Sequence, residues 1–139
     1  MPSDNQTPVA NISYLKDKET DEPIAGFLGM RLIDLSPGFA RVAMTMKPDY
    51  INFNGMVFGG IVMSLADQAF AYATNSLLMP NLAIQFNINL IAAAATGDEL
   101  TAQCRVVKSG RRISVSEMTV TNQDGRLVAR ASGTTIHTG

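Results

Sequence analysis

The chain has 139 residues, the length of one domain, and its 46% hydrophobic and 17% charged residues are typical of a globular protein. Eleven basic and twelve acidic residues give a net charge of −1, which argues against nucleic acid as a partner. The only cysteine is Cys104 and the only histidine is His137. These counts exclude an internal disulfide framework and cysteine- or histidine-rich metal sites, and we expect neither a metal nor a cofactor.

The N-terminal stretch, Met1 to Glu22, is polar and contains no apolar segment of the kind found in secretory signals. No apolar run elsewhere approaches the ~18 residues that a membrane span needs. We therefore expect a cytoplasmic protein with no membrane partner. We also expect residues 1–20 to form a flexible arm, with a helical turn or more around residues 11–18, and residues 21–139 to form a single domain.

The remaining chain predicts an α+β fold. Two short β-prone runs, residues 30–35 and 39–47, flank a turn at Ser36-Pro37-Gly38. Residues 59–79 have apolar side chains at helical spacing around most of the circumference, which predicts a buried helix. Apolar and polar residues then alternate, predicting four further strands over residues 82–90, 100–106, 113–121 and 127–136. This order favours an antiparallel sheet wrapped around one long central helix.

One acidic residue lies in the predicted helix. Asp67 follows Leu65 and Ala66, and it shares a narrow polar stripe with Ser64, Thr74 and Asn75. A carboxylate among apolar neighbours is costly unless it is hydrogen-bonded or faces a wet pocket. In a partly dry cleft its pKa rises, which suits a general base or a nucleophile. We interpret Asp67 as a catalytic candidate, and the alternative is a structural or solvated carboxylate.

The predicted helix opens with Gly59 and Gly60. The first N–H groups of a helix have no partner within it, and together with the helix dipole they favour negative charge. Such groups can hold a developing oxyanion. Upstream, Asn52 and Asn54 have two equally weighted interpretations: they orient a water or a carbonyl, or they form an Asx turn before the helix.

A cluster of cations, Lys108, Arg111 and Arg112, surrounds the predicted turn near residue 110. Such charges commonly form a solvated edge, but three cations close together can also hold phosphates. His137 has no partner motif, which argues against a Ser–His–Asp triad.

The segment from Asn52 to Ser76, NFNGMVFGGIVMSLADQAFAYATNS, resembles the hotdog-fold acyl-CoA thioesterases, most closely the phenylacetic-acid-degradation branch. The resemblance implies that Asp67 is the base or nucleophile that acts on the thioester. It also implies that the Gly59 N–H polarises the carbonyl, and that Asn52 places water or substrate. It places Arg111 and Arg112 where such proteins often meet the coenzyme A nucleotide. We also expect substrate contacts from Phe58, Gly60, Asn54, Ser64 and Lys108.

In the family that the chain resembles, the acid and the oxyanion donor come from different subunits, so the resemblance implies a homodimer or homotetramer. Two positions depart from the family pattern. Phe58 stands where the family usually has the histidine of His-Gly-Gly, and Ala92-Ala93 stands where it often has Arg-Pro. The expected activity is hydrolysis of acyl-CoA or aryl-CoA thioesters, and the alternative is a non-catalytic acyl-CoA-binding or sensing protein.

Overall fold

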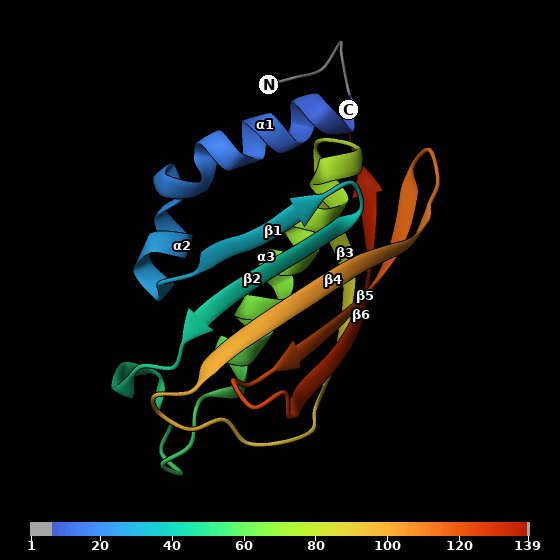
Figure 1. Ribbon diagram of the computed structural model, residues 1–139. Coiled ribbons are helices and arrows are strands. Elements are labelled where there is room, and N and C mark those ends of the chain that lie inside the picture. Colours follow the sequence, from blue (N-terminus) through green and yellow to red (C-terminus); the bar gives the residue numbers. More distant parts are fainter. Residues whose placement is uncertain (1–6, 139) are drawn as a thin grey trace.

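The computed structural model describes residues 7–138 (Figure 1). It contains three α-helices within that range: α1 (Pro8–Lys18), α2 (Pro23–Leu28) and α3 (Gly59–Leu77). Short 3₁₀ turns cover Glu19–Asp21 and Pro48–Tyr50. The strands are β1 (Arg31–Ser36), β2 (Phe39–Thr45), β3 (Asn81–Leu90), β4 (Glu99–Ser109), β5 (Ile113–Thr121) and β6 (Leu127–His137).

The strands form one six-stranded sheet in the order β1-β2-β4-β5-β6-β3, and every neighbouring pair is antiparallel. The sheet curves around α3, which runs across its concave side (Figure 1). This confirms the predicted order of two strands, one helix and four strands, and it confirms the hotdog fold. Every predicted strand is present, with differences of a few residues at its ends.

The core lies between α3 and the sheet. Leu65, Ala66, Ala69 and Phe70 are almost fully buried on the side of α3 that faces the strands. The ring of Phe70 packs against Phe86 of β3, with centroids 5.9 Å apart. A Cβ atom on Gly133 of β6 would lie 2.6 Å from the Phe70 ring, so glycine at that position lets the helix approach the sheet closely.

The N-terminal segment contains the helical turn predicted around residues 11–18, but the helix is longer than predicted and packs against α3. Residues 8–18 form α1, whose first turn is capped where the Ala10 N–H donates to Thr7 Oγ1. Asn11 is fully buried, and its side-chain amide donates to the carbonyl of Ser76 at the end of α3. The contact with α3 orders a helix that its own sequence only weakly favours. Residues 1–6 of the predicted arm lie outside the described residues.

The two edges of the sheet are β1 and β3. β3 presents a row of apolar side chains that are about half exposed: Leu82, Ile84 and Leu90. A long edge strand with exposed apolar residues is a template for pairing with another chain. Within residues 7–138, none of the helices has the combined length and apolar character required to cross a membrane.

Candidate active site

The predicted polar stripe of α3 is present for most of its length. Asp67 and Ala71 are exposed one turn apart, and Ser64 and Asn75 beside them are half-buried. The stripe differs from the prediction at Thr74, which is buried and whose hydroxyl donates to the Phe70 carbonyl at 2.9 Å. Thr74 is therefore a structural residue of the helix end.

Asp67 lies in a shallow hollow of about 260 Å³ between α3 and β3. The other lining residues are Met63, Ser64 and Phe86. Two of these three neighbours are apolar, and partial burial among them raises the pKa of the Asp67 carboxyl above its usual value. The Ser64 hydroxyl donates to the Gly60 carbonyl at 2.8 Å, which links this hollow to the start of the helix. A carboxylate in this environment can accept a proton or attack a carbonyl carbon.

The first residue of α3 is Gly59, and Phe58 precedes it as the N-cap without a side-chain hydrogen bond to the helix. The Phe58 N–H donates to the Tyr50 carbonyl at 2.8 Å, and the Ile61 N–H donates to the Phe58 carbonyl at 2.9 Å. Among residues 7–138, no acceptor is bound by the N–H groups of Gly59 and Gly60. These two donors are available to a ligand.

Both glycines are closely covered by side chains. A Cβ atom on Gly59 would lie 2.7 Å from Cδ1 of Leu90, the last residue of β3. A Cβ atom on Gly60 would lie 2.6 Å from the ring of Phe58, which is itself 57% exposed. Phe58 thus lies over the start of the helix.

The loop before α3 uses Asn52 in an Asx turn. The Oδ1 of Asn52 accepts from the N–H groups of Asn54 and Met56, at 2.9 and 3.2 Å. Of the two interpretations of this residue, the structure has the turn. Asn54 is exposed at the tip of the loop. A second hollow of about 280 Å³ lies beside the loop, and its lining residues are Asp49, Tyr50, Ile51, Asn52, Phe58 and Ile61.

Within one chain, the Gly59 N–H and the Asp67 carboxylate are too far apart to contact the same carbonyl group. They are eight residues apart on one helix, which corresponds to about 12 Å along its axis. A single thioester carbonyl cannot contact both groups at hydrogen-bond distance across that separation. One chain therefore carries both components of the predicted site but does not assemble them.

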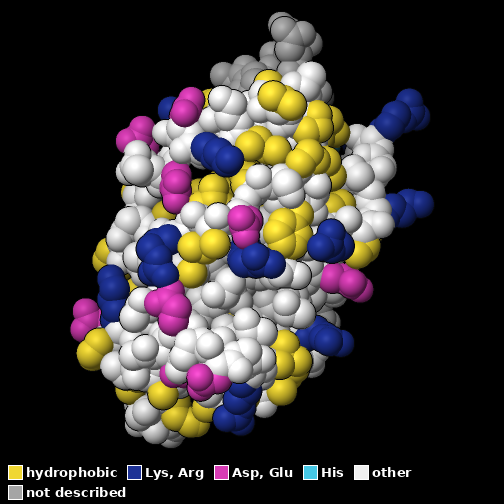
Figure 2. All heavy atoms as spheres, in the orientation of Figure 1, with side chains coloured by type: hydrophobic (Ala, Val, Ile, Leu, Met, Phe, Trp, Pro, Cys, Tyr) yellow, Lys and Arg dark blue, Asp and Glu magenta, His cyan; other side chains and the backbone are white. Residues whose placement is uncertain are grey.

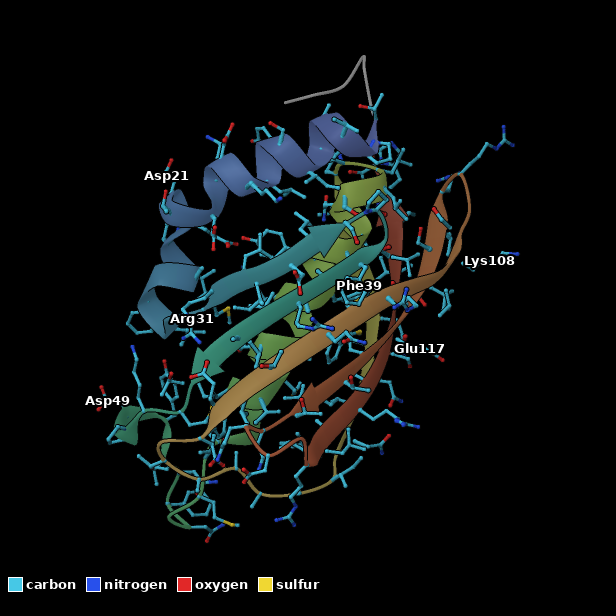
Figure 3. All side chains as sticks on the ribbon, in the orientation of Figure 1. Asp21, Arg31, Phe39, Asp49, Lys108 and Glu117 are labelled. Carbon is cyan, nitrogen blue, oxygen red and sulfur yellow. The ribbon has the colours of Figure 1, made fainter. Side chains whose placement is uncertain are left out.

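The basic cluster lies at the other end of the sheet. Lys108, Arg111 and Arg112 are exposed around the β4–β5 turn, where Lys and Arg side chains project from the surface (Figures 2 and 3). The Arg112 carbonyl accepts from the His137 N–H at 2.7 Å, and His137 pairs with Asn81 at the start of β3. Within residues 7–138, none of the three cations forms an ion pair. Their charge is free to bind an anion.

Comparison with known proteins decides the family. Residues 54–129 match the model of the thioesterase superfamily. This chain belongs to that superfamily. A putative esterase from Archaeoglobus fulgidus is 37% identical over 126 residues, which are 91% of this chain and 79% of the relative.

Two solved structures are similar to this chain over most of its length. The PaaI protein from the phenylacetic acid degradation operon of Escherichia coli superposes with a TM-score of 0.90 and 30% identity, covering 96% of this chain and 97% of that chain. A hypothetical thioesterase from Streptococcus pneumoniae, solved with coenzyme A, has a TM-score of 0.81 and 30% identity, covering 90% of this chain and 97% of that chain.

Three features of the site region were not predicted from the sequence. Phe86 forms a wall of the Asp67 hollow, and Leu90 covers Gly59. The alternation along β3 predicts one buried face for both residues, but it does not indicate which part of α3 they contact. The third feature is a larger hollow beside Ala71 and Tyr72, built partly from the N-terminal segment. No sequence signal indicates it, because its walls come from residues 15–22 and 68–75, which meet only in the folded chain.

Proposed function

We propose that this thioesterase-superfamily member hydrolyses acyl-CoA or aryl-CoA thioesters. The observation that carries the proposal is Asp67, a carboxylate with a raised pKa in a hollow on the same helix that opens with unpaired N–H donors at Gly59 and Gly60. A relative from Escherichia coli, 34% identical over 113 residues that are 81% of each chain, is named an acyl-coenzyme A thioesterase. Acyl-CoA is the substrate class that this comparison supports.

In the proposed reaction, the Asp67 carboxylate removes a proton from water, and the hydroxide attacks the thioester carbon. Direct attack by the carboxylate, followed by hydrolysis of the resulting anhydride, gives the same products. In both routes the carbonyl oxygen gains negative charge, and the Gly59 N–H donates to it. The C–S bond breaks, the CoA thiolate leaves and takes up the proton that Asp67 removed from water, and the free acid is released with Asp67 again ionised.

The proposed site requires a dimer formed by the β3 edges. Leu90 of β3 lies at the level of Gly59, and Phe86 lies at the level of Asp67. A twofold axis midway between them, at Ile88, exchanges these two levels when the β3 strands of two copies pair antiparallel. The partner subunit's Gly59 then lies beside Asp67. A homotetramer built from two such dimers keeps the same site.

The phosphates of CoA are assigned to Lys108, Arg111 and Arg112. Arg112 is linked through His137 of β6 to Asn81 of β3, which is five residues from Phe86. The cluster therefore lies about 17 Å along the strands, and about 10 Å across the sheet, from the Asp67 hollow. The pantetheine arm separates the phosphates of CoA from its thioester and would span this distance. The charged phosphates also prevent CoA esters from crossing membranes unaided, which favours the predicted cytoplasmic location.

The experiment that tests the proposed function measures release of free CoA thiol from a panel of acyl- and aryl-CoA esters incubated with the purified protein. The proposal predicts saturable release with at least one member of the panel. Saturable binding without thiol release would instead support the non-catalytic binding or sensing function, which the substitution of Phe58 for histidine makes the second candidate. If the protein neither releases thiol from nor binds any of these esters, both functions are excluded.

We expect replacement of both Arg111 and Arg112 by alanine to raise KM for acyl-CoA and to flatten its dependence on salt, with little change in kcat. The reason is that exposed cations on phosphates contribute binding that is equal in the ground and transition states and is screened by ions. Steady-state kinetics at two ionic strengths measure both effects. Replacing Arg126, a cation outside the cluster, by alanine is the control. An unchanged KM in the double variant would mean that the three cations are solvated and do not bind the phosphates.

We expect the protein to sediment as a dimer or tetramer at micromolar concentration, and Ile84→Lys to sediment as a monomer without hydrolytic activity. Ile84 is 56% exposed on the β3 edge, where a lysine opposes strand pairing. Ile33→Lys is the matched control, because Ile33 is 50% exposed at a register shift in β1, the opposite edge of the sheet. A stable wild-type monomer would contradict the dimer and the shared site together.

A further inference from the structure

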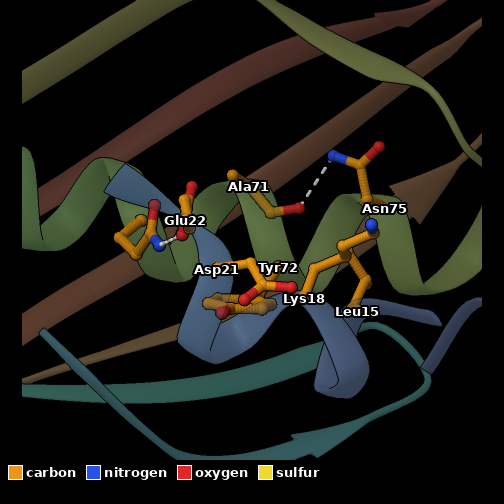
Figure 4. Close-up of a pocket in the computed structure, with 8 residues that line it drawn as sticks. Leu15, Lys18, Asp21, Glu22, Ala71, Tyr72 and Asn75 are labelled. Atoms are coloured by element: carbon orange, nitrogen blue, oxygen red, sulfur yellow. Dashed lines mark hydrogen bonds between the residues drawn. The ribbon is translucent and has the colours of Figure 1, made fainter. Parts of the chain in front are cut away.

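A hollow lies between the N-terminal segment and α3, and we refer to it as the N-terminal hollow (Figure 4). Its volume is about 410 Å³, within the range of small-molecule sites. One wall is formed by α1 and the turn that follows it, and the other by α3. The lining residues are Leu15, Lys18, Asp21, Glu22, Gln68, Ala71, Tyr72 and Asn75.

The hollow has an apolar interior and a polar rim that is held in place. Leu15, Ala71 and the ring of Tyr72 provide apolar surface. Gln68 bridges the two walls, because its side-chain amide donates to Glu22 Oε1 at 2.6 Å. Burial raises the pKa of Tyr72 to about 12, with smaller contributions from Glu22 and Glu19, so the phenol stays neutral at physiological pH. The interior therefore offers a neutral surface that is mostly apolar.

The N-terminal hollow adjoins the Asp67 hollow along the same exposed stripe of α3. Ala71 follows Asp67 by one turn, about 6 Å along the axis, and Asn75 follows by a second turn. Ala71 is exposed and has the smallest side chain of the non-glycine residues on the stripe. A group attached to a carbonyl at Asp67 can therefore pass over Ala71 into the N-terminal hollow.

We propose that the N-terminal hollow binds the acyl portion of the substrate and that Ala71 and Leu15 set the acyl length the enzyme accepts. This inference rests on the proposed function, because it assumes a thioester at Asp67. The charges favour the acyl group over the nucleotide: the rim carries Asp21 and Glu22 against Lys18, whereas CoA is anionic. The N-terminal wall lies outside residues 54–129, the part that matches the superfamily model. Length selectivity is thus supplied by a segment that the shared core does not include.

Two variants with opposite expected effects test this assignment. Ala71→Leu narrows the passage, so kcat/KM for octanoyl-CoA falls by about 10- to 100-fold while that for acetyl-CoA stays within a few-fold. Leu15→Ala enlarges the far wall, so the preference shifts toward acyl chains longer than octanoyl. Ala95→Leu, which adds the same side chain at an exposed loop position, is the control. A ratio of octanoyl-CoA to acetyl-CoA activity that is unchanged in both variants would overturn the proposal.

The same selectivity is measured without turnover by titrating octanoyl-CoA and acetyl-CoA into Asp67→Asn protein, with and without Ala71→Leu. We expect Ala71→Leu to weaken octanoyl-CoA binding selectively. If the parent protein releases no thiol but this selectivity appears, the proposed hydrolysis fails and the acyl site stands. If thiol is released but neither kinetics nor binding depends on residues 15 and 71, the hydrolysis stands and the acyl site is elsewhere.

Discussion

Asp67→Asn is expected to lower kcat for thioester hydrolysis by at least about 100-fold, the lower end for loss of a general base. The substitution keeps the size of the side chain and its capacity to accept a hydrogen bond, but it removes the negative charge that takes the proton or attacks the carbon. Binding of acyl-CoA should stay within a few-fold of the parent, because the phosphates and the acyl group are assigned to other residues. Thiol release and equilibrium titration measure the two quantities separately.

The pH dependence of the parent adds an independent check on the same residue. Burial raises the pKa of Asp67, and the carboxylate is the active form, so activity should rise with pH through that raised pKa. The free energy of unfolding changes with pH in the opposite direction to activity. Because the native state favours the protonated carboxyl, the stability associated with Asp67 is full below the unfolded pKa and declines as pH rises through the folded pKa.

At neutral pH, Asp67→Asn should therefore unfold at the same temperature as the parent or at a higher one. Asp17→Asn, on an exposed position of α1, is the control and should change neither activity nor the unfolding temperature. If Asp67→Asn hydrolyses thioesters at the parent rate, Asp67 is structural and the proposed mechanism is wrong. If Asp67→Asn unfolds, Asp67→Glu keeps the charge but moves the carboxylate by one methylene, and a folded variant of this kind with parent activity would contradict the proposed mechanism.

Gly59→Pro is expected to lower kcat by about 100- to 1,000-fold, the effect typical of losing one oxyanion donor. Proline removes the N–H of residue 59 but is well tolerated at the first position of a helix. The preceding residue, Phe58, has φ −59° and ψ 128°, which is the extended conformation that a residue before proline prefers. The variant should therefore fold while lacking the donor.

Gly59→Ala is the matched control for the added bulk. Alanine keeps the N–H, and its Cβ would meet Leu90 Cδ1, the end of a flexible side chain, as the proline ring also would. We expect Gly59→Ala to retain most of the activity that Gly59→Pro loses. Equal losses in the two variants would mean that the space above Gly59 matters, and not its N–H group.

The parts of the fold with strong local periodicity could be predicted from the sequence. The two-residue alternation of β3 and the apolar spacing of α3 each determine an element whose type needs no distant contact. The N-terminal helix could not be predicted with the same certainty, because Asn11 is ordered by a bond to Ser76, 65 residues away. Such a contact leaves no pattern in the short window that a sequence offers.

Some residues of the candidate site could likewise be predicted from local sequence features, and others could not. Asp67 and Gly59 were identified because an acid in an apolar helix and a glycine pair at its start are local features. For Asn52 the local pattern fitted two interpretations, and only the two hydrogen bonds to its Oδ1 distinguish them. The N-terminal hollow combines residues 15–22 with residues 68–75, so it exists only after the two segments pack together.

The most direct test of the shared site mixes two inactive variants, Asp67→Asn and Gly59→Pro, under conditions that allow subunits to exchange. In a mixed dimer, one site collects both defects, and the other combines an intact Asp67 with the intact Gly59 of the partner subunit. Random exchange of equal amounts should restore about a quarter of the parent thiol-release activity. If each chain builds its own site, every site in the mixture has one defect and no activity returns, which would contradict catalysis across the subunit interface.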